Sequence, residues 1–174
     1  MNKPLPTREQ AIEILQRNGC APKVIAHCQA VASLALEIAE KFKAKNYPVN
    51  LALVEAGALL HDLGRSKTHS VQHAFEGMKL AQAEGLPEEV ICIIKRHVGA
   101  GITDEEAQWL GWPKDNYIPQ SLEEKIVCYA DKCIGSDQRI PVEATIRQLH
   151  EQKLGDAAER VRKLHLEITS YLEA

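Results

Sequence analysis

Four side chains of metal-binding type stand at the ends or on the apolar faces of predicted helices: His27, the pair His61-Asp62, and Asp131. His27 lies on an apolar helix face, His61-Asp62 ends a segment that is apolar nearly all round, and Asp131 follows a hydrophobic run. Burying an imidazole or a carboxylate without a partner costs several kcal/mol, so such groups need each other or a metal ion. Their placement predicts a shared cation.

The adjacent residues His61 and Asp62 suit one ion because they end a helix. Neighbouring helical residues point about 100° apart, but the chain unwinds at a helix end, where both side chains can turn toward one target. Imidazole nitrogens with carboxylate oxygens suit divalent iron, manganese, nickel, cobalt or zinc. Fewer than six protein ligands leave positions for water and substrate, so the predicted centre could catalyse a reaction.

The order of these residues resembles a known family. His27, then His61-Asp62-Leu63-Gly64-Arg65, then Asp131 resembles the HD-domain superfamily of metal-dependent phosphohydrolases, whose pattern is H…HD…D on an all-helical core. The resemblance runs from about residue 26 to residue 133 and includes Tyr129-Ala130-Asp131-Lys132. It implies that His27, His61, Asp62 and Asp131 hold a metal ion.

Two further histidines, His73 and His97, resemble in position and order those that bind a second metal ion in a subset of that family. In that subset the aspartate matching Asp62 bridges the two ions. The resemblance therefore implies one or two divalent metal ions, with a bridging hydroxide as nucleophile. Taken alone, His73 would be a solvated first-turn residue and His97 a residue favoured by the negative end of a helix.

Arg65 matches a basic residue of the family and is expected to bind substrate phosphate, for which its planar guanidinium is well suited. In the expected reaction, metal-activated water attacks phosphorus while Arg65 holds a peripheral oxygen, and Asp62, or Asp131 by way of its metal, orients the water. The leaving group is protonated by solvent, or by His69 if that side chain reaches it. Other basic residues near the ligands in sequence could line the mouth of the pocket: Lys67, Lys95, Arg96 and Lys132.

The resemblance implies an enzyme that hydrolyses a phosphomonoester or a (cyclic) phosphodiester of a nucleotide-like or other small metabolite. Its expected partner is therefore a small phosphorylated substrate. Two alternatives stay open. A di-iron HD-fold oxygenase would need iron that changes valence and consumption of oxygen, and a non-catalytic nucleotide-binding regulatory module would bind its ligand without turnover.

The elements that must position these groups are predicted to be helices. Thr7 opens a capping box for a first helix, and Pro22 suits the first turn of a second. Asn50 can cap a third helix over residues 51–61, with Gly64 as its C-terminal stop signal. The remaining helices are predicted to begin at capping, acidic or proline residues: Ser70, Pro87, Thr103, Ser121, Pro141 and Asp156.

No segment alternates apolar and polar residues as a strand would between turn signals. We therefore predict an all-α fold, a single-domain HD-domain helical bundle of about seven or eight helices over residues 1–174. Its metal-binding core spans about residues 22–135, and C-terminal helices in 141–174 pack on that core. Trp109 and Trp112 flank a turn and could be packing anchors or a lid over the pocket; packing is the preferred interpretation.

Composition fits a globular protein, with 174 residues of which 45% are hydrophobic and 26% charged. A net charge of -3 gives no basic field for a nucleic-acid backbone, so we do not expect a nucleic-acid partner. The odd number of cysteines, five, without a C-x-x-C pair, fits a reducing cytosol, and no apolar run approaches the roughly 18 residues of a membrane span. We expect a cytoplasmic protein without a membrane partner. The sequence leaves open a homodimer.

Overall fold

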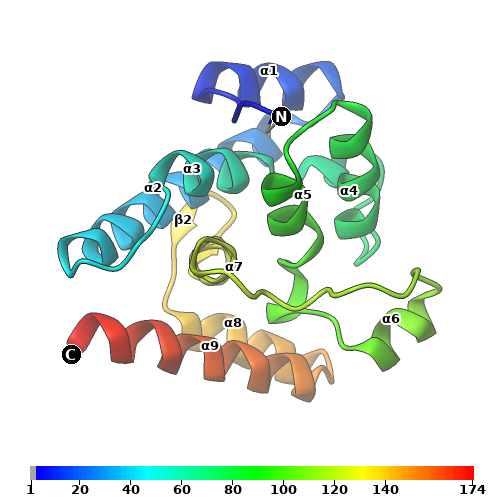
Figure 1. Ribbon diagram of the computed structural model, residues 1–174. Coiled ribbons are helices and arrows are strands. Elements are labelled where there is room, and N and C mark those ends of the chain that lie inside the picture. The colour runs from blue at the N-terminus through cyan, green and yellow to red at the C-terminus, as the bar shows by residue number, and fades with distance from the viewer. Residues whose placement is uncertain (1–2) are drawn as a thin grey trace.

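The predicted helices form in the computed structural model, which describes residues 3–174 (Figure 1). The all-α fold class is confirmed, with nine α-helices in these residues where about seven or eight were predicted. Their bounds are α1 Arg8–Arg17, α2 Pro22–Ala44, α3 Leu51–Leu60, α4 His73–Ala83, α5 Glu88–Lys95, α6 Asp104–Leu110, α7 Leu122–Lys132, α8 Val142–Glu151 and α9 Gly155–Glu173. Two 3-10 helices, η1 Leu63–Ser66 and η2 Val98–Ala100, and a hairpin of β1 Ile134–Gly135 and β2 Gln138–Arg139 complete them.

Helix α3 lies at the centre because almost every side chain it carries is apolar. Seven of its ten residues are buried, and it packs against α1, α2, α5 and α7. In Figure 1, α1 crosses one end of the molecule, while α8 and α9 lie at the other, beyond α7. Helix α3 therefore ends deep in the core, where its last turn delivers His61.

Local capping chemistry fixes several of the helix starts as predicted. Thr7 and Thr103 each accept a hydrogen bond from the third helical N–H and form complete capping boxes. Asn50 and Ser121 accept the same kind of bond at α3 and α7. These side chains satisfy backbone N–H groups that have no partner within the helix.

Two local predictions were wrong. Ser70 does not cap α4: its hydroxyl accepts from the backbone N–H of Gln72 in a turn, and the helix begins at His73. Gly64 does not end α3 either; that helix ends at Leu60, and Gly64 lies within η1, against α4. A Cβ added there would stand 1.8 Å from the carbonyl oxygen of His73 and 2.5 Å from the nitrogen of Gly77. Gly64 thus permits a backbone-to-backbone approach of η1 and α4.

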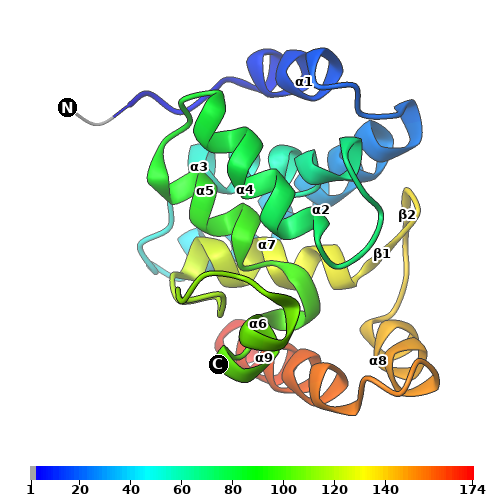
Figure 2. The ribbon, with the colours of Figure 1, turned by 90° about the vertical axis from the view of Figure 1, so that its right-hand side faces the viewer.

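The hairpin β1–β2 was also missed, because two-residue strands are too short to show alternation. It follows α7 directly and contacts α2. Beyond it, α8 and α9 pack on each other, and α9 contacts α7 and η2 (Figure 2). Apolar residues of α9 join the main core.

Residues 1 and 2 of the predicted domain lie outside the described residues. Within residues 3–174 no helix is both long and apolar enough to span a bilayer.

Candidate metal centre

The structure brings the six predicted metal ligands together from five stretches of the chain. Four of the six stand at or near helix ends: His61 follows α3, His73 is the first residue of α4, His97 follows α5, and Asp131 lies in the last turn of α7. His27 comes from the first turns of α2, and Asp62 joins α3 to η1.

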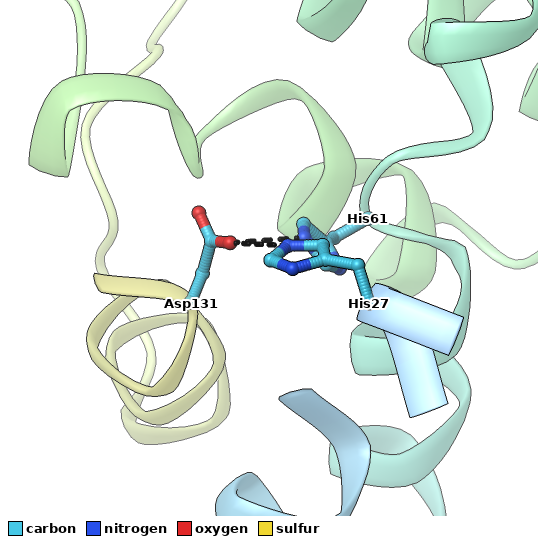
Figure 3. Close-up of side chains that lie close together, drawn as sticks. All are labelled: His27, His61 and Asp131. Atoms are coloured by element: carbon cyan, nitrogen blue, oxygen red, sulfur yellow. Dashed lines mark hydrogen bonds and ion pairs between the residues drawn. The ribbon is translucent and has the colours of Figure 1, made fainter. Parts of the chain in front are cut away.

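One group of donors surrounds Asp131 (Figure 3). Its Oδ1 lies 3.0 Å from Nε2 of His27 and 3.2 Å from Nε2 of His61. The Oδ2 of Asp62 faces the same two nitrogens at 3.6 and 3.5 Å. Two nitrogens and two carboxylate oxygens from far-apart segments therefore meet at one point, as a divalent transition metal requires.

A second group surrounds the other oxygen of Asp62. This Oδ1 lies 3.2 Å from Nε2 of His73 and 3.3 Å from Nε2 of His97, and the two nitrogens are 3.0 Å apart. Asp62 thus turns one carboxylate oxygen toward each group. A bridging carboxylate between two cations would have this orientation.

The same nitrogen of each imidazole is directed away from the centre by the backbone. Because a carbonyl oxygen can only accept, the Nδ1 that faces it carries the proton, and Nε2 of the neutral ring keeps its lone pair for the centre. Three of the four carbonyls lie three residues before the histidine, at helix ends or in a turn. The pairs are His61 with Ala58 (2.6 Å), His73 with Ser70 (2.7 Å), His97 with Ile94 (2.7 Å), and His27 with Ser136 (2.5 Å).

This donor set fits a metal ion. Among the described residues, His61 Nε2 is the one buried side-chain nitrogen or oxygen without a hydrogen-bond partner; its 3.2 Å contact with Asp131 is outside hydrogen-bond geometry. At His73 and His97, two acceptor nitrogens 3.0 Å apart repel each other unless a cation lies against both. Both features are costly for the polypeptide alone and are explained by bound cations.

The electrostatics of the centre also favour cations. Burial by itself would raise the pKa of both carboxyl groups. At Asp62 the nearby His61, His73 and His97 lower the pKa by more than burial raises it. At Asp131 the nearby Lys132 and His61 do the same. The pKa of each aspartate therefore lies well below its ordinary value. Burial lowers the pKa of His97 to about 4, which keeps its ring neutral. The two carboxylates outweigh burial at His61 and hold its pKa well above the ordinary value, as expected beside concentrated negative charge.

A cavity of about 550 Å³ opens beside these ligands, and three of the predicted basic residues line it: Arg65, His69 and Lys132. Arg65 donates to the carbonyl oxygen of His69 at 2.6 Å, and its Nε lies 3.6 Å from Asp62. Lys132 donates to Asp131 at 2.7 Å and to the carbonyl oxygen of His97 at 3.0 Å. Positive charge therefore lines the cavity beside the carboxylates.

The other basic residues expected at the mouth of the pocket are not part of the cavity wall. Lys95 pairs with Asp115 at 2.5 Å, and Arg96 binds the carboxylate of Glu124 at 3.0 Å. Lys67 is exposed outside the cavity. Nearness in sequence was a poor guide here because these side chains leave their helix or loop in other directions.

The apolar wall of the cavity was missed by the sequence reasoning. Its larger members come from α6, α8 and the segment between α8 and α9, which no motif links to the predicted ligands. They are Trp109, Leu110, Leu149 and Leu154. Trp112 is buried, as the packing interpretation predicted, but that interpretation was wrong for Trp109, whose exposed fraction is 87%. The sequence offered no signal to separate the two tryptophans.

The HD domain family model matches residues 24–135. An uncharacterized protein of Methanocaldococcus jannaschii is 41% identical to this chain. The match covers 91% of this chain and 92% of that protein. A tRNA (cytidine(56)-2'-O)-methyltransferase of Thermoplasma volcanium is 39% identical over 94% of this chain, and the chain spans 47% of that relative's length.

Among solved structures, the HD domain of the phosphodiesterase PgpH from L. monocytogenes superposes with a TM-score of 0.57. The match covers 94% of this chain and 99% of that domain, at 15% sequence identity. At this identity the likeness concerns the fold.

Proposed function

This chain belongs to the HD domain family, and from that premise we propose that it is a metal-dependent phosphohydrolase with a two-ion centre. The observation that carries the proposal is the placement of Asp62, whose two oxygens face separate pairs of imidazole nitrogens. His27 and His61, with Asp131, would hold one ion. His73 and His97 would hold the other.

Divalent ions at this centre would activate water as a nucleophile and neutralise charge on a phosphoryl group. The chain's own residues do the rest. Lys132 binds Asp131 and keeps that carboxylate anionic and oriented. Arg65, held in the cavity wall by its hydrogen bond to the His69 carbonyl, binds a peripheral phosphate oxygen. The exposed His69 side chain, in the same wall, donates a proton to the leaving oxygen.

The proposed substrate is a phosphomonoester or a (cyclic) phosphodiester of a nucleotide-like or other small metabolite. The cavity volume of about 550 Å³ supports this, because small-molecule sites commonly occupy roughly 300–1,000 Å³. A phosphate ester of RNA is the second candidate, favoured by the name of the T. volcanium relative, which refers to tRNA. A substrate panel should contain both classes.

Metal content and turnover should be lost together when a central ligand is removed. We expect Asp62→Ala to retain less than one ion per chain and to hydrolyse phosphate esters at least about 100-fold more slowly, because it removes a donor from both groups. Elemental analysis of protein purified without chelators, followed by a panel of mono- and diesters with each metal, measures both. Exposed His150 on α8 supplies the control, His150→Ala, which should behave as wild type.

An Asp62→Ala protein with full metal-dependent turnover would contradict the proposal. Oxygen consumption by iron-loaded protein without phosphate release would favour the oxygenase. Tight nucleotide binding by metal-loaded protein without hydrolysis of any ester would favour the regulatory module.

A further inference from the structure

The lining of the cavity beside the metal centre has two chemically different parts. Arg65 and Lys132 line it together with His73, His97 and Asp131 of the proposed centre. Trp109 of α6 and Leu154, in the segment between α8 and α9, line the same cavity, and both remain in contact with solvent. A phosphate group satisfies the charged part of this lining only. The apolar part requires a group with apolar surface.

Trp109 is the most exposed large apolar side chain of residues 3–174. Its exposed fraction is 87%, whereas Leu154 and the other exposed large apolar residues are at 50% or less. Trp112, three positions later, is 6% exposed, stacks on Phe75 at an interplanar angle of 19°, and donates its indole N–H to Gln72 at 2.6 Å. Trp112 therefore anchors the fold, and an indole as exposed as Trp109 contributes little to it.

The helix that carries Trp109 is tied to α9 by an ion pair. A capping box at Thr103 starts α6, and Glu106 in its first turn binds the guanidinium of Arg160 on α9 at 3.0 and 3.1 Å. Arg160 also donates to the carbonyl oxygen of Gly99, next to the metal ligands, at 3.2 Å. Trp109 follows Glu106 by three residues and so shares its helix face. The indole therefore lies on the face of α6 that the ion pair turns toward α9, and it lines the cavity.

We infer that the substrate, under the phosphohydrolase function proposed above, carries a flat aromatic ring that stacks on Trp109 while its phosphate lies at the metal centre. Heterocyclic bases are the main biological groups of this kind, and base stacking on an aromatic side chain tolerates partial exposure to water. The side-chain amide of Gln152, which also lines the cavity, suits the polar edge of a heterocycle and not an aliphatic chain. Trp109 is therefore a specificity-determining residue.

The test compares adenosine 5′-phosphate with ribose 5-phosphate, which has the same sugar phosphate without the base. Calorimetry on the metal-loaded protein should show that Trp109→Ala weakens binding of the nucleotide about tenfold or more and leaves that of the sugar phosphate unchanged. Trp109→Phe should restore most of the loss. The matched control is Leu166→Ala, an exposed apolar residue of α9 outside the cavity wall, which should change neither affinity.

Equal binding of the nucleotide by wild type and Trp109→Ala, equal losses for both probes, or no binding of either probe to wild type would overturn the inference. So would a loss for octyl phosphate as large as that for the nucleotide. If wild type hydrolyses esters while Trp109→Ala binds the nucleotide normally, only this inference fails. If nucleotide binding depends on Trp109 but no ester is hydrolysed, the proposed function fails and the inference stands.

Discussion

At the scale of single residues, the chemistry of the centre depends on which nitrogen each histidine presents. In His61, His73 and His97 the ring bends back to the carbonyl oxygen three residues earlier. Each of these bonds is local, so the backbone itself selects the tautomer before any distant contact forms. His27 depends instead on Ser136, 109 positions away. Of the four histidines, only His27 needs the hairpin β1–β2 to be in place before its ring is oriented.

Gly64 provides a prediction at this scale. We expect Gly64→Ala to lower the free energy of unfolding by about 1–3 kcal/mol, because its Cβ would meet backbone atoms of α4 that cannot move aside as a flexible side chain can. The melting temperature, measured by circular dichroism, should fall by several degrees. Gly155→Ala is the control, since a Cβ there would meet its nearest atom only at 4.0 Å. Equal melting temperatures for Gly64→Ala and wild type would show that η1 and α4 can separate without cost.

The six candidate ligands were chosen from the sequence because the order of His27, His61-Asp62 and Asp131 resembles that of a family, and His73 and His97 resemble a subset of it. Their convergence was expected, but the sharing of Asp62 between two sets of nitrogens came from the resemblance alone. Sequence could not show that Lys95 and Arg96 bind Asp115 and Glu124, because those partners lie 20 and 28 positions away.

At the scale of elements, the centre is built from helix ends. The last carbonyls of a helix have no partner within it, and at α3 and α5 they accept from the histidine that follows. Capping motifs are local in sequence, which is why the starts of α1, α3, α6 and α7 were predicted correctly. The start of α4 was not, because the hydroxyl of Ser70 accepts a hydrogen bond within a turn and the helix begins only at His73.

The relative position of α5 and α7 depends on a buried ion pair. Arg96 donates to both carboxylate oxygens of Glu124. The side chain of Arg96 is 12% exposed and that of Glu124 is 9% exposed. We expect Glu124→Ala to lower the free energy of unfolding by about 3–5 kcal/mol, because it leaves a guanidinium buried without its partner. Denaturant titration measures this loss.

The exposed pair Arg162–Glu159 serves as the comparison for that measurement, and Glu159→Ala should cost less than about 1 kcal/mol. Replacing both buried partners with apolar residues, Arg96→Met with Glu124→Leu, should recover most of the stability. A loss for Glu124→Ala no larger than that for Glu159→Ala would rule out the pair as the link between α5 and α7.

At the scale of the whole molecule, the cavity draws on parts of the chain that no motif connects. The all-α fold could be predicted from helical periodicity and the absence of strand patterns. The cavity wall could not, since Trp109 on α6 and Leu154 after α8 become neighbours of the ligands only through the packing of α9 on η2 and α7. Periodicity locates a helix in sequence and gives no information on its neighbours in space.

Metal removal should destabilise the whole fold. If the folded chain binds the ion and the unfolded chain does not, free metal at a hundred times its dissociation constant contributes about 2.7 kcal/mol. For a chain of this size we expect chelation to lower the melting temperature by roughly 5–10 °C, measured by calorimetry with and without chelator. Asp62→Ala protein should show no such shift. A shift of the same size in Asp62→Ala would place the stabilising ion elsewhere.

The spread of the ligands along the chain has a consequence for the order of events during folding. His27 and Asp131 are 104 positions apart, so an unfolded chain holds them together only at a high entropic cost of loop closure. Short metal-binding motifs nucleate a fold, whereas these donors meet only after α2, α3 and α7 have assembled. Ions should therefore enter late: they slow unfolding and leave the rate of refolding almost unchanged.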